Sequence, residues 1–281
     1  MKDHDNVRKG VTEAYTRAVK SESGGCGCQK SAVAQLAGYS TEELAGLPID
    51  AVVNSFGCGN PVAFAGVKAG DVVLDLGSGA GIDLLIAADK TGPTGKVIGV
   101  DMTGEMIERA RKNIAAAGYQ NVEVRKGIIE KLPVEDASVD WVISNCVINL
   151  SPEKDRVFAE IARVLKPGGQ MSVSDLVVKD LPDWVRENTD LYNACVSGAI
   201  SEEEYVAGLE RAGLEAVEVK ERLVYDPAQI EQIAEKAVQA GAESLSGCCG
   251  PATADPVARA AESVAGRIWS AKFYAKKPAG N

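Results

Sequence analysis

The order of strand-like and helix-like segments after residue 71 constrains the fold of this chain more than any other feature. Short β-branched runs alternate with longer amphipathic segments, and glycine or proline turns separate them. The expected strands are 72–76, 96–100, 122–126, 139–145, 170–176, 216–224 and 268–276, and the expected helices between them include 81–90, 104–117, 152–165 and 201–213. Because parallel neighbours need right-handed helical crossovers, this order predicts an α/β fold with a doubly wound, mostly parallel seven-stranded sheet.

The two ends of the chain differ from this regular core. Residues 1–38 are polar and then glycine-rich, so we expect a short helix at 7–20 followed by a mobile loop that contains Cys26 and Cys28. The main domain is expected at 39–224. A helical insertion at 225–267 with the pair Cys248-Cys249 then precedes the last strand and tail, 268–281.

Length and charge limit the possible partners. A chain of 281 residues can bury one substantial core, and its net charge of −10 without a cluster of basic residues is unsuited to the phosphate contacts of nucleic acids. No apolar run is long enough to span a membrane, and the first residues lack the apolar stretch of a signal peptide. We therefore expect a cytoplasmic protein without nucleic-acid or membrane partners.

The cysteine and histidine content excludes several kinds of site. Seven cysteines at irregular spacing do not describe a secreted disulfide scaffold, and Cys26-x-Cys28 and Cys248-Cys249 are too close for the usual zinc half-sites. The single histidine, His4, stands at the amino terminus, which argues against Ser-His-Asp and Cys-His hydrolases. The chemistry of this chain must therefore proceed without imidazole.

A glycine-rich loop follows the first expected strand. Its sequence, Gly77-Ser78-Gly79-Ala80-Gly81, stands at the first strand-to-helix turn, which approaches the ligand most closely in a doubly wound sheet. The spacing is G-x-G-x-G and not the G-x-G-x-x-G of dinucleotide-binding proteins. This shorter spacing is a variant found at S-adenosylmethionine sites, so we expect that cofactor in place of NAD.

Polar residues at other strand ends agree with a cofactor site. Asp101 ends the second expected strand, where a carboxylate can accept hydrogen bonds from both ribose hydroxyls, and Met102 can cover one face of adenine. Asn145 ends the fourth expected strand. The alternative is that the glycines only make a tight turn and that Asp101 merely ends a strand. The agreement of all these positions favours cofactor binding.

Cysteines also occur in surroundings typical of a site. Cys58 lies in Gly57-Cys58-Gly59-Asn60-Pro61, Cys146 follows Asn145 at a strand end, and Cys195 precedes Val196-Ser197-Gly198. Thiols together with a cofactor loop indicate chemistry on a soft atom. The alternative for Cys146 and Cys195 is that each is a small buried apolar residue. For Cys26 and Cys28 the alternative is an exposed, flexible segment without a role.

These cysteine contexts and the cofactor loop together give the chain a clear resemblance. Over residues 39–213 it resembles the S-adenosylmethionine-dependent arsenite methyltransferases. The segments that carry the resemblance are 57–61, 73–81, 100–103, 129–133, 144–151, 163–169, 174–175 and 195–199. The resemblance implies a Rossmann-like, class I methyltransferase fold and the transfer of a methyl group from S-adenosylmethionine to trivalent arsenic, as in arsenic detoxification.

The resemblance also implies roles for individual residues. Cys146 and Cys195 would hold arsenic as thiolates, with Cys58 as third ligand or redox partner, and Cys26 or Cys28 would form a disulfide with Cys58. The implied cofactor contacts are Gly77 and Gly79 at the methionine part with Asn145 beside it, Asp101 on ribose, Met102 on adenine, and the backbone of Ile129 at the adenine edge. Ser78, Gly81, Ile128 and Glu130 are further expected cofactor-binding residues. Ile128 stands where relatives often have a polar residue, so recognition of the adenine amino group falls to backbone groups or Glu130.

Arsenic chemistry agrees with this set of residues. Soft thiolates exchange readily for the hydroxides of arsenite or for the ligands of its thiol conjugate, and the arsenic lone pair can then attack the sulfonium methyl without a general base. The expected partners are arsenite or its thiol conjugate and a thiol reductant, either thioredoxin or a small thiol. Asp175 and Glu130 are expected to be solvated or structural. Two alternatives are a methyltransferase of the same fold acting on another small molecule and a thiol-based arsenite-binding protein without turnover.

Overall fold

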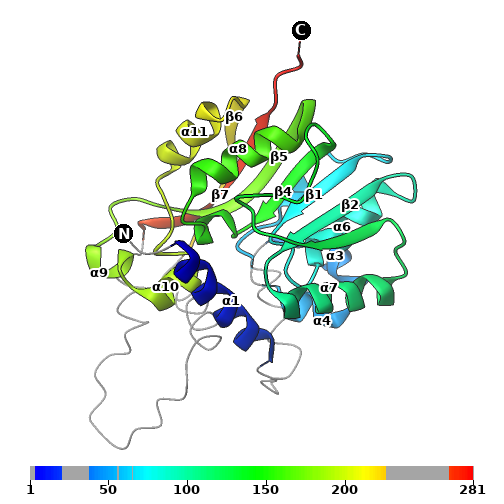
Figure 1. Ribbon diagram of the computed structural model, residues 1–281, viewed down its shortest axis with the longest axis horizontal. Coiled ribbons are helices and arrows are strands. Elements are labelled where there is room, and N and C mark those ends of the chain that lie inside the picture. Colours follow the sequence, from blue (N-terminus) through cyan, green and yellow to red (C-terminus); the bar gives the residue numbers. More distant parts are fainter. Residues whose placement is uncertain (1–3, 21–37, 56, 65, 226–265, 281) are drawn as a thin grey trace, which may run out of the picture.

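Seven strands form one sheet in the order β3-β2-β1-β4-β5-β7-β6 in the computed structural model, which describes residues 4–20, 38–55, 57–64, 66–225 and 266–280 (Figure 1). Strands β1 to β5 pair in parallel, and β7 pairs antiparallel with both β5 and β6. The bounds are β1 Val72–Leu76, β2 Lys96–Asp101, β3 Val122–Lys126, β4 Val139–Asn145, β5 Leu165–Val178, β6 Glu215–Val224 and β7 Ile268–Lys276. The predicted doubly wound, mostly parallel sheet is confirmed.

Helices cover both faces of the sheet, because successive side chains of a strand point to opposite faces. On one face Val73 packs among residues of α6 (Ile82–Thr91) and α7 (Gly104–Ala117). On the other face Leu74 packs among residues of α8 (Lys154–Val164) and α11 (Glu202–Arg211). These helices correspond to four predicted from the sequence. Among the described residues, no helix combines the length and apolar content needed to cross a membrane.

Several short elements were not predicted. They are α3 Thr41–Ala45, α4 Ile49–Val53, α5 Pro61–Phe64, the 3₁₀-helix η1 Ile148–Leu150, α9 Asp183–Arg186 and α10 Thr189–Asn193. Each spans at most five residues, which is too short for a helical period to appear in the sequence. Strand β5 begins at Leu165, earlier than predicted, because Leu165 pairs with Val139 of β4 across an irregularity in the ladder.

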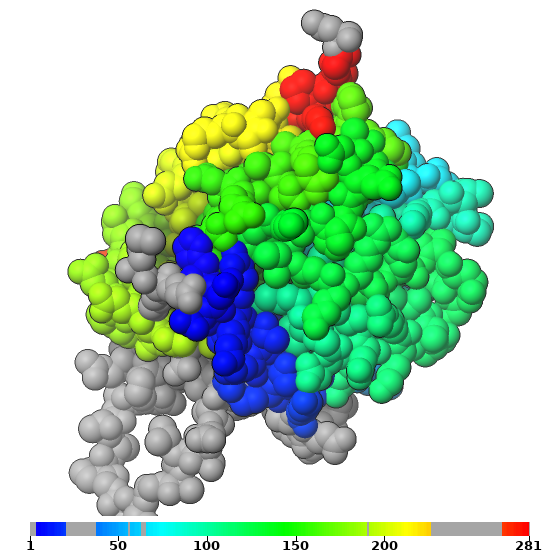
Figure 2. Space-filling model, in the orientation of Figure 1, coloured from blue at the N-terminus to red at the C-terminus, as the bar shows by residue number. Residues whose placement is uncertain are grey.

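Helix α1 (His4–Lys20) lies beside the ends of the parallel strands (Figure 1), and Figure 2 shows it in blue on the surface of the molecule. It buries Val11, Ala14 and Val19 and contacts α7 and α10. The helical part of the predicted mobile segment 1–38 is therefore packed against the main domain. Cys26, Cys28, Cys248, Cys249 and nearly all of the predicted insertion 225–267 lie outside the described residues, so those domain boundaries remain predictions.

Candidate functional site

The glycine-rich loop joins β1 to α6 with a backbone that favours glycine. Gly77, Gly79 and Gly81 have φ angles of 64°, 51° and 95°, in the left-handed region that other residues adopt at an energetic cost. A Cβ atom on Gly77 would also collide with the side chain of Val147. The Gly77 amide donates to the carbonyl of Val100 at 2.7 Å, which ties the loop to the end of β2.

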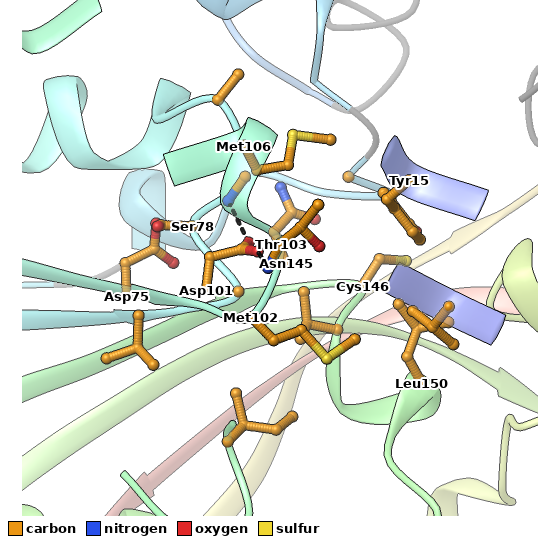
Figure 3. Close-up of a pocket in the computed structure, with 18 of the residues that line it drawn as sticks. Tyr15, Asp75, Ser78, Asp101, Met102, Thr103, Met106, Asn145, Cys146 and Leu150 are labelled. Atoms are coloured by element: carbon orange, nitrogen blue, oxygen red, sulfur yellow. Dashed lines mark hydrogen bonds between the residues drawn. The ribbon is translucent and has the colours of Figure 1, made fainter. Parts of the chain in front are cut away.

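Asp101 at the end of β2 faces this loop (Figure 3). Its carboxylate accepts hydrogen bonds from the amides of Gly79 at 3.0 Å and Thr103 at 2.8 Å. Burial raises the pKa of Asp101, and these backbone donors oppose the rise. The loop and the acid are therefore fixed relative to each other.

The segment after β3 lines the same pocket as the loop and Asp101. Ile128, Ile129 and Glu130 line the pocket with Met102. Glu130 is only 4% exposed, and its Oε1 accepts from Arg8 Nε at 3.2 Å and from Ser151 Oγ at 2.7 Å. Of the two expectations for Glu130, solvated or structural, the structural one applies, because protein donors replace water at this carboxylate.

Asn145 at the end of β4 holds the loop that carries Cys58. Its Oδ1 accepts from the amides of Cys58 at 2.9 Å and Gly59 at 3.1 Å, and its Nδ2 donates to Tyr39 Oη at 2.9 Å. A Cβ on Gly57 would collide with Asn145, so only glycine allows the loop to pass this closely. The three elements β4, the cysteine loop and the segment of Tyr39 are thereby joined at one side chain.

Cys58 and Cys146 form a disulfide, with their Cα atoms 5.7 Å apart. The pairing differs from the one implied by the family resemblance, in which Cys26 or Cys28 joins Cys58. The physical reason is proximity. Asn145 holds the Cys58 loop next to Cys146, which follows Asn145 in the chain, at the ordinary Cα separation of bonded cysteines. Cys26 and Cys28 lie outside the described residues.

Cys195 lies beside this disulfide as a buried free thiol. Its Sγ donates to the carbonyl oxygen of Cys146 at 2.8 Å. Burial and the nearby Asp175 raise the pKa of Cys195 well above the ordinary value, while Tyr15 and Lys154 oppose the rise. Cys146 and Cys195 have φ angles of 59° and 64°, an uncommon conformation for residues other than glycine and one that gathers at functional sites.

Asp175 belongs to the cysteine cluster, although no chemical role was expected for it from the sequence. A carboxylate oxygen of Asp175 and the sulfurs of Cys58 and Cys146 all lie within 4.8 Å of one another. Asp175 is fully buried, accepts from Asn149 Nδ2 at 2.8 Å, and has a pKa raised by burial to about 7. Of the two expected roles, solvated or structural, burial leaves the structural one for Asp175. Asp175 lies on β5 next to the end of β4. Because neighbouring parallel strands end close together, as for Asp101, this position could have predicted that Asp175 lies near Cys146.

One pocket joins the cofactor loop to the cysteine cluster (Figure 3). Of the predicted cofactor residues, its lining includes Gly77, Ser78, Gly79, Asp101, Met102, Ile128, Ile129, Glu130 and Asn145. Gly81 is absent from the lining and starts α6 behind the loop. Cys146 lines the pocket itself, whereas Cys58 and Cys195 are buried next to Cys146 in one apolar cluster.

Helix α1 contributes a wall of the pocket that the sequence analysis missed. Arg8, Val11 and Tyr15 line it, and the spacing of Val7, Val11 and Tyr15 at four-residue intervals was the available signal. Figure 3 shows Tyr15, Cys146 and Leu150 together at one end of the pocket. The amino-terminal helix is therefore part of the site.

Comparisons with known proteins agree with this geometry. Residues 67–213 match a methyltransferase domain family. The arsenite methyltransferase of Halobacterium salinarum is 48% identical over 202 residues, which cover 71% of this chain and 51% of that protein. The arsenite methyltransferase of Aquipseudomonas alcaligenes is 42% identical over 153 residues, covering 52% of this chain and 44% of that protein. The chain thus spans about half the length of the curated relatives it matches.

A solved structure covers more of the molecule. The arsenic(III) S-adenosylmethionine methyltransferase of Chlamydomonas reinhardtii aligns with a TM-score of 0.62 and 32% identity, over 89% of this chain and 74% of that one. Both the fold and the family resemblance expected from the sequence are confirmed by these matches. The chain belongs to the methyltransferase domain family and, within it, to the S-adenosylmethionine-dependent arsenite methyltransferases.

Proposed function

We propose that this chain transfers a methyl group from S-adenosylmethionine to trivalent arsenic bound by cysteine thiolates. The observation that carries the proposal is the position of Cys146, which lines the same pocket as the glycine loop and Asp101 while Cys58 and Cys195 adjoin it. A thiol site and a cofactor site that share one residue bring the two reactants to adjacent positions, which is the main requirement of a direct transfer.

The residues around the loop fit the cofactor. In this proposal the methionine part lies along the backbone of Gly77 to Gly79, Asp101 accepts from the ribose hydroxyls, and Ile128 and Met102 offer apolar surface to adenine; all of these residues line the pocket. S-adenosylmethionine, when bound, supplies an electrophilic methyl on a sulfonium. The protein then contributes orientation and exclusion of water, because most of these side chains are at least half-buried.

The cysteines fit the substrate. Each As–OH group of arsenite exchanges with a thiol to give an As–S bond and water, and sulfur is the donor that soft arsenic prefers. Cys146 and Cys195 are the proposed ligands, with Cys58 as the third, and the lone pair left on pyramidal arsenic is the nucleophile. No histidine is needed for this step, in agreement with the position of His4 on the exposed start of α1.

The disulfide adds a redox requirement. Two of the three proposed ligands, Cys58 and Cys146, are bonded to each other, so their sulfurs bind arsenic only after reduction. We therefore propose that a dithiol protein such as thioredoxin, or a small thiol, reduces this disulfide to two thiols, and is itself oxidised, before arsenite binds.

The test is incubation of the reduced protein with arsenite and S-adenosylmethionine, followed by chromatographic separation of arsenic species with mass detection. Methylated arsenic is expected from the wild type and is expected to be lost in Cys146→Ser and Cys195→Ser, with cofactor affinity in calorimetry retained. The matched control is the oxidised wild type, which has the same sequence but in which the disulfide blocks the sulfurs of Cys58 and Cys146.

Three other outcomes would contradict part of the proposal. Cofactor binding with arsenite left unchanged would favour another small-molecule substrate. Tight arsenite binding that S-adenosylmethionine never converts to product would favour a thiol-based binding protein. Methylation that survives both serine variants would contradict the thiol site.

A further inference from the structure

Tyr15 stands between the cofactor pocket and the cysteine cluster. It lines the pocket from α1 and packs against the apolar cluster that contains Cys58, Cys146 and Cys195. Met102, on the cofactor side, packs against the same cluster. Tyr15 is thus in contact with both halves of the site.

The hydroxyl of Tyr15 points at the segment that carries Cys195. It donates to the carbonyl oxygen of Asn193, two residues before Cys195, at the long distance of 3.5 Å, and its oxygen lies beside the Cys195 thiol. The thiol in turn donates to the carbonyl of Cys146 at 2.8 Å. A sulfur bonded to arsenic has no proton to donate to Cys146, but it can accept a hydrogen bond from the Tyr15 hydroxyl in place of the long one to Asn193.

Helix α1 is fixed at both ends to the cofactor side of the site. Near its start Arg8 pairs with Glu130 at 3.2 Å, and near its end Lys20 and Thr16 bond Glu105 at 2.8 and 3.0 Å. Glu130 follows β3 and Glu105 lies in the first turn of α7, after β2. The position of Tyr15 is therefore set by the elements that frame the cofactor.

We propose that Tyr15 is a positioning residue for methyl transfer, whose hydroxyl orients the arsenic-bound sulfur of Cys195 toward the cofactor pocket. The proposal rests on the proposed function. Hydrogen bonds to a metal-bound ligand atom fix its direction and tune its electron density. Here the hydrogen bond from Tyr15 would fix the direction of the Cys195 sulfur relative to α1, the helix that lines the cofactor pocket.

The test is Tyr15→Phe, which keeps the ring and its packing and removes only the hydroxyl. We expect kcat for arsenite methylation to fall about tenfold, the range for loss of a hydrogen bond to a charged atom. The KM for arsenite, the Kd for S-adenosylmethionine and the stoichiometry of arsenite binding to the reduced protein are expected to stay within about twofold, since Tyr15 makes none of the arsenic bonds. A purely structural role would change these binding constants as well.

The matched control is Thr12→Val on the same helix, whose hydroxyl bonds the backbone carbonyl of Arg8 at 2.9 Å. It is expected to keep the wild-type kcat. Wild-type kcat in Tyr15→Phe would overturn the role of Tyr15 and leave the proposed function intact. Lost cofactor or arsenite binding in Tyr15→Phe would equally overturn it, in favour of a structural role. Absence of methylated arsenic from the wild type would overturn the proposed function, and this inference with it.

Discussion

The side-chain oxygen of Asn145 accepts a hydrogen bond from the backbone amide of Cys58 at 2.9 Å, across 87 residues of sequence. The same oxygen accepts from the amide of Gly59. One side chain at the end of β4 therefore sets the position of the cysteine loop relative to Cys146, the next residue along the chain.

Replacing Asn145 by alanine is expected to release that loop. Two amides lose their acceptor, and each buried amide left without one costs about 1–3 kcal/mol. We expect a lower free energy of unfolding in urea and slower reoxidation of Cys58 with Cys146, measured by quenched alkylation. Asn121→Ala is the control, because Asn121 bonds the carbonyls of Gly92 and Gly95 at a distant turn. Reoxidation at the wild-type rate would contradict the role of Asn145.

Alanine at Gly77 is expected to close the cofactor pocket. The added methyl meets Val147 in a backbone region that already disfavours alanine. We expect the Kd for S-adenosylmethionine to rise at least about tenfold in calorimetric titration, equivalent to about 1.4 kcal/mol. Gly168→Ala is the control, because it introduces the same backbone strain without a steric collision. Gly168 has a φ of 79°, and no atom lies within 4 Å of the added Cβ. An unchanged affinity in Gly77→Ala would exclude close approach of cofactor to this loop.

Cys195 is expected to react slowly with alkylating reagents. Only the thiolate reacts, and burial raises the pKa of Cys195, so its thiolate fraction near neutral pH is smaller than that of an ordinary cysteine. In the reduced protein, labelling of the Cys195 peptide by iodoacetamide should therefore accelerate about tenfold per pH unit from pH 7 to 9 without a plateau. Mass spectrometry of the digested protein measures this rate. Rapid labelling at pH 7 would show that the thiol is neither buried nor protonated.

The stability of the protein is expected to depend on pH through Asp175. Burial raises the folded pKa of Asp175 to about 7, above its value in the unfolded chain, so the folded state holds the proton more tightly. The stability contributed by this group is complete below about pH 4 and is lost as pH rises through about 7.

Asp175→Asn keeps an oxygen for Asn149 and Leu176 and removes the titration. Relative to this variant, the wild type should lose unfolding free energy between about pH 4 and 7, by at most about 1.4 kcal/mol per pH unit. Urea unfolding of both proteins at several pH values measures the difference. Parallel pH curves would mean that Asp175 does not retain its proton in the folded state.

Local pattern was sufficient for much of the fold. The strands β1, β3, β4 and β7 begin and end where the sequence predicts, because β-branched runs bounded by turns determine them locally. The position of Asp101 in the pocket followed from topology, since the carboxyl ends of parallel strands meet at one edge. These parts of the site need no knowledge of distant contacts.

The rest of the site depends on contacts between distant segments. Cys58 pairs with Cys146 over a separation of 88 residues, and cysteine spacing alone does not determine a pairing. Arg8 meets Glu130 over 122 residues, and that ion pair helps to hold α1 on the pocket. Charged residues such as these appear solvent-exposed in a sequence until the fold supplies their partners.

The antiparallel course of β7 has a practical consequence for experiments. Its last residue, Lys276, pairs with Gln170 of β5, so the chain leaves the sheet where the parallel strands begin, and Figure 1 marks the C-terminus there. The pocket lies at the other ends of these strands. The first residue of α1, His4, instead lies near the pocket. Its Nδ1 is 3.4 Å from Oε2 of Glu153, and the Glu153 amide donates to the hydroxyl of Ser151, which lines the pocket. An affinity handle or surface attachment joined after residue 280 would therefore leave the mouth of the site open to cofactor and reductant, whereas one joined ahead of α1 would crowd it.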